Sequence, residues 1–298
     1  MAGWSDYTNQ NIANYYSGSR PLPALPSIWL ALFTTPPTSD AGTGGVEVSG
    51  TAYARQQIAG PLTAASTIST GSPNITMPTN PGWVVPGMQV FDTTNAPANG
   101  FIGTVLTYIG TALVLTANAA HAGTGATDTL TFSAFAPATA SSGNPEPNTL
   151  PGGITNSNAV VTFAQAGAGG WGTVAGFAAF DAVTSGNMLW WDYLGNFKWI
   201  PFSCSSGTPG VLTTDANADV PANGSICAVT QKYGGTLPTT AGSWAYPLTS
   251  AGSSTNTFNL GVNTTSVGGG LFRQVTQQPI AANVTPSFST SQLTLTDA

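Results

Sequence analysis

Residues 42–56 read GTGGVEVSGTAYARQ, and they hold one of the two glutamates and one of the three arginines in the chain. The glycines permit tight turns and close approach of neighbouring backbone. Val46 and Val48 alternate with Glu47, which is the pattern of a short strand. We therefore expect Glu47 and Arg55 on adjacent short strands, as a structural pair across the ladder or with a neighbouring subunit.

The sequence on both sides of this stretch is typical of short strands joined by turns. SIWLALFTT (27–35) is a buried-strand candidate, and FIGTVLTYI (101–109) is another. VTSGN (183–187), between FAAFDA and MLWWDYL, is a hairpin signal. The chain has 36 glycines and 22 prolines, which disfavours long helices.

These features predict an all-β fold: a β-sandwich or barrel-like core, one or two inserted small β domains and an extended N-terminal arm. Ser5 or Asp6 would cap a short helix within the arm. The expected divisions follow: an arm at 1–24, a discontinuous core at 25–62, 154–200 and 278–298, an inserted β domain at 63–135, a linker at 136–153 and a polar, loop-rich second insertion at 201–277.

The charge content argues against several classes of partner. Only 5% of residues are charged, against about 25% in an ordinary soluble domain, and the net charge is −6. Five basic residues spread over the chain cannot form a phosphate-binding stripe, so we expect no nucleic-acid partner. No run approaches the ~20 apolar residues of a membrane-spanning helix, and the N-terminus lacks the pattern of a secretory signal.

The sequence offers little catalytic or metal-binding chemistry. One histidine and two cysteines cannot build an ordinary structural metal site, so we expect no metal, no cofactor and no catalytic residues. Asp181 and Asp192 lie close enough in sequence to approach each other near a hairpin, which leaves a virion depolymerase as an enzymatic alternative. Cys204 and Cys227 are either free thiols or a disulfide.

Aromatic residues are concentrated after the predicted hairpin. Trp190 and Trp191 would point to opposite faces of one strand, so at least one of them faces away from a single core. The alternatives are a core with a subunit contact or a platform on which a glycan stacks. The candidate interface aromatics are Trp190, Trp191, Tyr193, Trp199, Trp244 and Tyr246.

Three segments of the chain resemble a family of tailed-phage virion proteins called head decoration, head fibre or tail fibre proteins. The first runs from ALFT (31–34) through the glycine-rich turn to EVSGTAYAR (47–55). The second joins SNAVVTF (157–163) to WGTVAGFAAFDA (171–182). The third is ANVTPSFSTSQLTL (282–295), which departs from the family pattern at Asn283 and Ser291. Together these segments cover about a third of the chain.

The resemblance implies a structural role on the outer surface of a virion that is assembled in the host cytoplasm. The leading hypothesis is a capsid decoration or cement protein (a head fibre), a homotrimer that binds the major capsid protein and stabilises the capsid. The alternative is a tail-fibre or collar component that contacts host surface glycans. Neither role requires a membrane or nucleic-acid partner.

Overall fold

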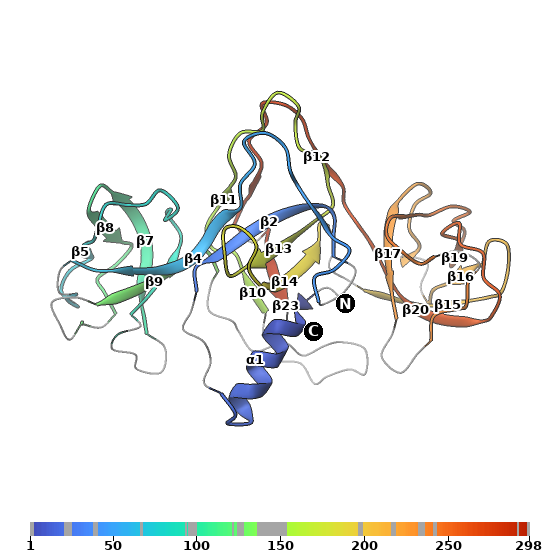
Figure 1. Cartoon of the computed structure of the whole chain (residues 1–298), viewed down its shortest axis with the longest axis horizontal. Helices are drawn as coiled ribbons and strands as arrows, with labels where there is room; N and C mark the ends of the chain where they lie inside the picture. The colour runs from blue at the N-terminus through green and yellow to red at the C-terminus, as the bar shows by residue number, and fades with distance from the viewer. Residues whose placement is uncertain are drawn as a thin grey trace.

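The computed structural model contains a central β region with one lobe on each side (Figure 1). The predicted linker at 136–153 lies outside the described residues. The structure describes residues 3–20, 26–37, 41–65, 68–92, 94, 100–120, 122–123, 128–135, 154–195, 199–215, 219–231, 236–240, 243–290 and 292–296. Nearly all of its regular structure is antiparallel β-strand, so the all-β prediction is confirmed.

The central region is the first part of an eleven-stranded sheet. Its strands, in spatial order, are β1 (Gly3–Trp4), β14 (Met188–Tyr193), β13 (Gly176–Phe180), β2 (Ile28–Thr35) and β4 (Gln56–Thr63). The short β3 (Val46–Glu47) also pairs with β2, and places Glu47 opposite Phe33. The hairpin predicted at 183–187 joins β13 to β14.

The central residues of β2 are all apolar because both faces of this strand are buried. Leu30 and Leu32 point into the larger of two cores, whereas Ala31 and Phe33 point into a second core on the opposite face. A strand that is covered on both faces needs no polar side to meet solvent, so it loses the alternating pattern of a half-exposed strand.

The first lobe continues the central sheet. β4 pairs with β2 near its start on one edge and with β9 over Ala59–Thr63 on the other edge, so the sheet continues through β4 into the lobe. The segment expected as an insertion at 63–135 therefore shares the larger core with the central region. Its strands are β9 (Thr129–Ser133), β6 (Gln89–Asp92), β7 (Phe101–Ile109), β8 (Ala112–Leu115) and β5 (Asn74–Thr76).

The second lobe is a six-stranded sheet with a core of its own, built around Phe202, Phe258 and Phe272. The second core, which β2 lines with Ala31 and Phe33, lies between this lobe and the central sheet. The lobe's strands, in spatial order, are β18 (Leu248–Thr249), β17 (Ile226–Thr230), β20 (Gly268–Gln274), β15 (Ile200–Cys204), β16 (Leu212–Thr213) and β19 (Thr257–Phe258).

A long antiparallel ribbon joins the segment before the second lobe to the segment after it. Residues 154–174 run against residues 278–296 along this ribbon. The paired strands are β10 (Ile154–Asn156) with β23 (Thr294–Thr296), β11 (Val161–Thr162) with β22 (Ser287–Phe288), and β12 (Gly172–Val174) with β21 (Gln278–Ile280).

Helix α1 (Asp6–Tyr16) follows the edge strand β1 and projects from the base of the central region (Figure 1). Ser5 is its N-cap, which identifies the cap between the two predicted candidates, and its hydroxyl accepts a hydrogen bond from the Thr8 amide. None of the helix residues is buried. Among the described residues, no helix has the length and apolar character needed to cross a bilayer.

A substitution at Gly50 tests how closely the 42–56 stretch packs against the ribbon. A Cβ on this residue would collide with the indole of Trp171 and lie 2.7 Å from the Gly170 carbonyl oxygen. We expect Gly50→Ala to lower the free energy of unfolding by about 1–3 kcal/mol, measured by urea denaturation. The matched control is Gly169→Ala, whose Cβ would meet nothing within 4 Å. Equal stability of the two variants would contradict this prediction.

Candidate functional site

Glu47 and Arg55 form a bidentate ion pair within the chain. Arg55 Nε donates to Glu47 Oε1 at 2.9 Å, and Arg55 Nη2 donates to Oε2 at 2.8 Å. The Arg55 side chain is only 8% exposed, whereas that of Glu47 is 27% exposed. This fork-to-fork geometry fixes the direction of both side chains, which a single hydrogen bond would leave free to rotate.

Tyr53 adds a third polar group to the pair. Its hydroxyl donates to Glu47 Oε1 at 3.0 Å and accepts a hydrogen bond from the Leu32 amide at 2.9 Å. Burial raises the pKa of the Tyr53 hydroxyl well above its usual value, so the group stays protonated and keeps donating. The Tyr53 ring packs edge-on against Trp171, with ring centroids 5.2 Å apart.

Arg55 also binds the hairpin between β13 and β14. Its Nη1 donates to the carbonyl oxygens of Ala182, at 3.0 Å, and Ser185, at 2.7 Å. The guanidinium lies over the ring of Phe180, 3.6 Å from the ring centroid. One arginine therefore connects β3 and the segment before β4 to a hairpin more than 120 residues later in the chain.

The hairpin has the left-handed backbone that its sequence predicts. Ser185 and Gly186 have φ angles of 55° and 79°. Asp181 closes the turn, because its carboxylate accepts from the Asn187 amide at 2.6 Å and from Asn187 Nδ2 at 2.7 Å. The Asn187 side chain is thereby held in one orientation.

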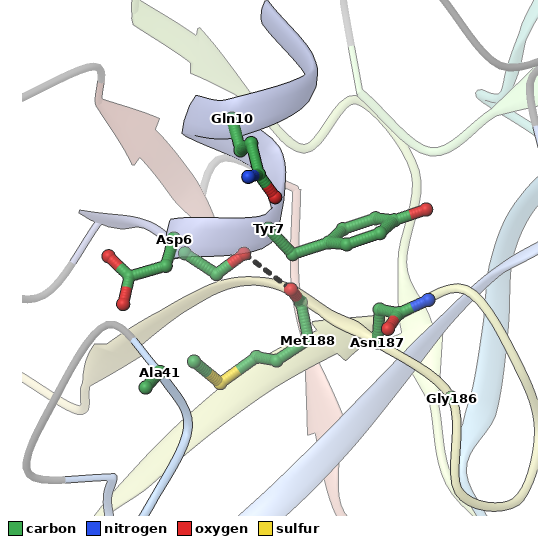
Figure 2. Close-up of a pocket in the computed structure, with 8 residues that line it drawn as sticks. Asp6, Tyr7, Gln10, Ala41, Gly186, Asn187 and Met188 are labelled. Atoms are coloured by element: carbon green, nitrogen blue, oxygen red, sulfur yellow. Dashed lines mark hydrogen bonds between the residues drawn. The ribbon is translucent and has the colours of Figure 1, made fainter.

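A cavity of about 540 Å³ lies between this hairpin and the first turns of α1 (Figure 2). The helix is fixed there by Ser5, whose amide donates to the Leu189 carbonyl at 2.9 Å and whose hydroxyl donates to the Met188 carbonyl. Thr8 Oγ1 donates to the Leu189 carbonyl at 2.7 Å. The lining residues are Ser5, Asp6, Tyr7, Gln10, Ala41, Gly186, Asn187 and Met188.

The cavity lining combines hydrogen-bonding groups with apolar surface. The described lining residues supply one carboxylate, two amides and a phenol, and none of them is a Lys or Arg. In the described part of the chain, no three His, Cys, Asp or Glu residues are grouped so as to hold a metal ion. The lining can therefore form hydrogen bonds in both directions with an uncharged polar ligand.

Three of the predicted interface aromatics are core residues. Trp190 is buried in the larger core, and Trp191 and Tyr193 are buried in the second core. The alternation predicted for Trp190 and Trp191 is present, but the second lobe covers the face that an external partner was expected to cover. These three side chains are therefore not free to contact another subunit or a glycan.

The other three predicted aromatics are half-buried and also have partners within the chain. Trp199 and Tyr246 pack against the second core, and the Tyr246 ring lies 5.5 Å from that of Tyr193. Trp244 packs against Phe202, and its Nε1 donates to the Pro238 carbonyl at 3.1 Å.

Cys204 and Cys227 are buried free thiols. They lie on β15 and β17, the two neighbours of β20, opposite Gly268 and Gln274 respectively. An intervening strand and an offset of six residues place their α-carbons about 20 Å apart, given the usual strand spacing and rise. A disulfide requires α-carbons within roughly 7 Å, so the structure excludes the disulfide alternative.

A second ion pair, between Asp192 and Arg273, could not be predicted from the sequence. Arg273 on β20 donates from Nη1 to Asp192 Oδ1 on β14, and its side chain is only 1% exposed. Burial raises the pKa of the Asp192 carboxyl, and the Arg273 charge opposes that rise. This pair connects the second lobe to the central sheet. Asp192 and Arg273 are 81 residues apart. The local sequence contains one indication of the pair, which is an arginine within a mostly apolar strand.

Comparison with known proteins gives one family match. The family model described as "Podophage GP4 fiber I protein gp80" matches residues 3–134 and 104–201. These two overlapping matches include the Glu47–Arg55 pair, the hairpin and the residues that line the cavity. No curated protein matches the chain.

We expect Arg55→Ala to lower the free energy of unfolding by about 2–4 kcal/mol. The substitution leaves Glu47 partly buried without its counter-charge and releases two hairpin carbonyls. Arg20→Ala is the matched control, because Arg20 is exposed, and it should change stability by less than about 0.5 kcal/mol. Urea denaturation measures both, and a cost for Arg55→Ala as small as the control's would refute the role given to the pair.

Both thiols should be unreactive in the native protein. Burial raises the pKa of Cys227 to about 12 and also raises that of Cys204, so almost no thiolate is present at pH 8. Mass spectrometry after iodoacetamide treatment should find no adduct on the folded chain. In denaturant without reductant it should find two adducts, whereas an unlabelled mass there would indicate a disulfide.

Proposed function

The chain belongs to the family of the podophage GP4 fiber I protein gp80, and we propose that it decorates the outside of a phage capsid as a head-fibre protein. Family membership carries this proposal, and it supports a fibre-type structural role in a phage particle. The position on the capsid and the stabilisation of the capsid are the parts that an experiment must test.

A structural role fits the way the chain uses its charged residues. The Glu47–Arg55 pair connects the 42–56 stretch to the hairpin, and the Asp192–Arg273 pair connects a lobe to the central sheet. Asp181 and Asp192, the candidate acidic pair of a glycan hydrolase, lie at different levels of the β13–β14 hairpin. Asp192 is paired with Phe177, four residues before Asp181, which corresponds to about 13 Å along the strand. Inverting glycosidases hold their carboxylates roughly 6.5–9.5 Å apart and retaining ones closer, so we propose that the protein is not an enzyme.

The proposed contacts with the particle involve the N-terminal helix. An isolated helix of this length is marginally stable in water, and α1 buries no side chain within its own chain. Tyr15 and Tyr16, which are 48% and 82% exposed, lie at its projecting end. Exposed aromatic side chains are favoured in protein interfaces, so we propose that α1 docks on the major capsid protein or on a neighbouring copy in a homotrimer.

Assembly in the host cytoplasm is consistent with the two free thiols. Cysteines remain reduced in that compartment, whereas proteins folded in oxidising compartments commonly form disulfides. The proposal includes no nucleic acid, membrane or cofactor partner.

The number of copies per virion tests the position on the capsid. Quantitative mass spectrometry of purified particles, normalised to the major capsid protein, should find on the order of hundreds of copies, because a decoration protein follows the repeats of the capsid lattice. A count on the order of tens or fewer would overturn the head-fibre proposal and favour a tail-fibre or collar component.

A further inference from the structure

We propose that the cavity between α1 and the 181–187 hairpin binds a neutral saccharide. The proposal rests on the proposed function in one respect: a protein on the outer surface of a virion is exposed to host glycans. Its chemical argument comes from the cavity itself.

The cavity has the size of a small-ligand site and walls from two separate parts of the chain. Its volume of about 540 Å³ falls within the range of ordinary ligand pockets. Figure 2 shows Asp6, Tyr7 and Gln10 extending from the helix, with Gly186, Asn187 and Met188 facing them from the hairpin and the start of β14.

The hydrogen-bonding groups of the cavity suit a ligand with many hydroxyls. The carboxylate of Asp6 accepts hydrogen bonds, while the amides of Gln10 and Asn187 both donate and accept. Neighbouring hydroxyls of a sugar ring need this combination, because each hydroxyl is both a donor and an acceptor. The ring of Tyr7 supplies apolar surface for the C–H face of the sugar.

The charge of the cavity selects against acidic ligands. Among the described residues that line the cavity, Asp6 carries the only charge, and none of them is a Lys or Arg that would neutralise a phosphate or a carboxylate. The N-terminal amides of α1 are a weak substitute, since the Ser5 hydroxyl already accepts from the Thr8 amide. A neutral sugar is therefore favoured over a sialylated or phosphorylated one.

The hairpin wall is organised before any ligand arrives. Asp181 accepts from the backbone amide and from Nδ2 of Asn187, which leaves the side-chain oxygen Oδ1 and the second Nδ2 hydrogen of Asn187 for a ligand. Gly186 is required in this wall, because it has a positive φ and its Cβ would lie 2.6 Å from Asp181 Oδ1. Groups that are fixed in place lose little conformational entropy on binding.

The test uses the full chain and an array of neutral oligosaccharides that contain glucose, galactose, mannose or N-acetylglucosamine, alongside their sialylated and phosphorylated counterparts. We expect binding to at least one neutral member and at least tenfold weaker binding to its acidic counterparts. Tyr7→Ala and Gln10→Ala should each weaken the binding at least fivefold, as measured by titration calorimetry. Tyr16→Ala is the matched control on the same helix, away from the cavity, and should bind as the wild type does.

Absence of binding to every neutral member, or binding that Tyr7→Ala and Gln10→Ala leave intact, would overturn the saccharide site. Preference for the acidic counterparts would overturn it as well. Circular dichroism and thermal unfolding of each variant establish that a loss of binding is not a loss of folding. The copy number in virions is measured separately, so a protein that is present in particles but binds no neutral glycan would refute this site and leave the virion role standing.

Discussion

Arg55 connects β3 and the segment before β4 to the β13–β14 hairpin, which is distant from them in sequence. Its guanidinium has five N–H donors in a rigid plane, and the structure directs them to the Glu47 carboxylate and to two carbonyls of the β13–β14 hairpin. Because the side chain is almost fully buried, each of these hydrogen bonds replaces one that water would otherwise make. Arg55 thereby helps to fix the tip of the hairpin that forms one wall of the cavity.

A second buried pair of an arginine and a carboxylate lies where the second lobe meets the central sheet. Arg273 is buried there against Asp192, with the rings of Tyr193 and Trp199 each 5.5 Å from its guanidinium carbon. Two of the three arginines in the chain thus lie at internal boundaries, where apolar packing alone would allow sliding. Buried ion pairs add little net stability, but they favour one relative placement of the packed elements over its alternatives.

The local features of the fold could be predicted from the sequence, and the contacts between distant segments could not. The apolar run at 27–35 indicates a strand covered on both faces, and VTSGN indicates a hairpin, because both signals depend on neighbouring residues alone. Strand alternation places Trp190 and Trp191 on opposite faces. It does not reveal that a lobe of the same chain covers the second face, which from the sequence alone is expected to meet a partner.

The long-range contacts of the candidate site could likewise not be predicted from the sequence. The scarcity of charge was enough to single out Glu47 and Arg55, but no local pattern relates Tyr7 to Asn187, which lie 180 residues apart and line one cavity. Cys204 and Cys227 show the reverse case. They are near each other in sequence and are separated in space by a strand and an offset along it.

The long ribbon has a consequence for the order of events during synthesis. Its second strand is made of residues 278–296, so the partners at 154–174 remain unpaired until the ribosome has translated that later segment. Pairings between residues so distant in sequence also form late in folding, since a large loop must close first. A chain that ended before residue 278 would lack this closure and leave the edge at 154–174 unpaired. Closure of the ribbon therefore depends on a segment that is synthesised after the whole of the second lobe.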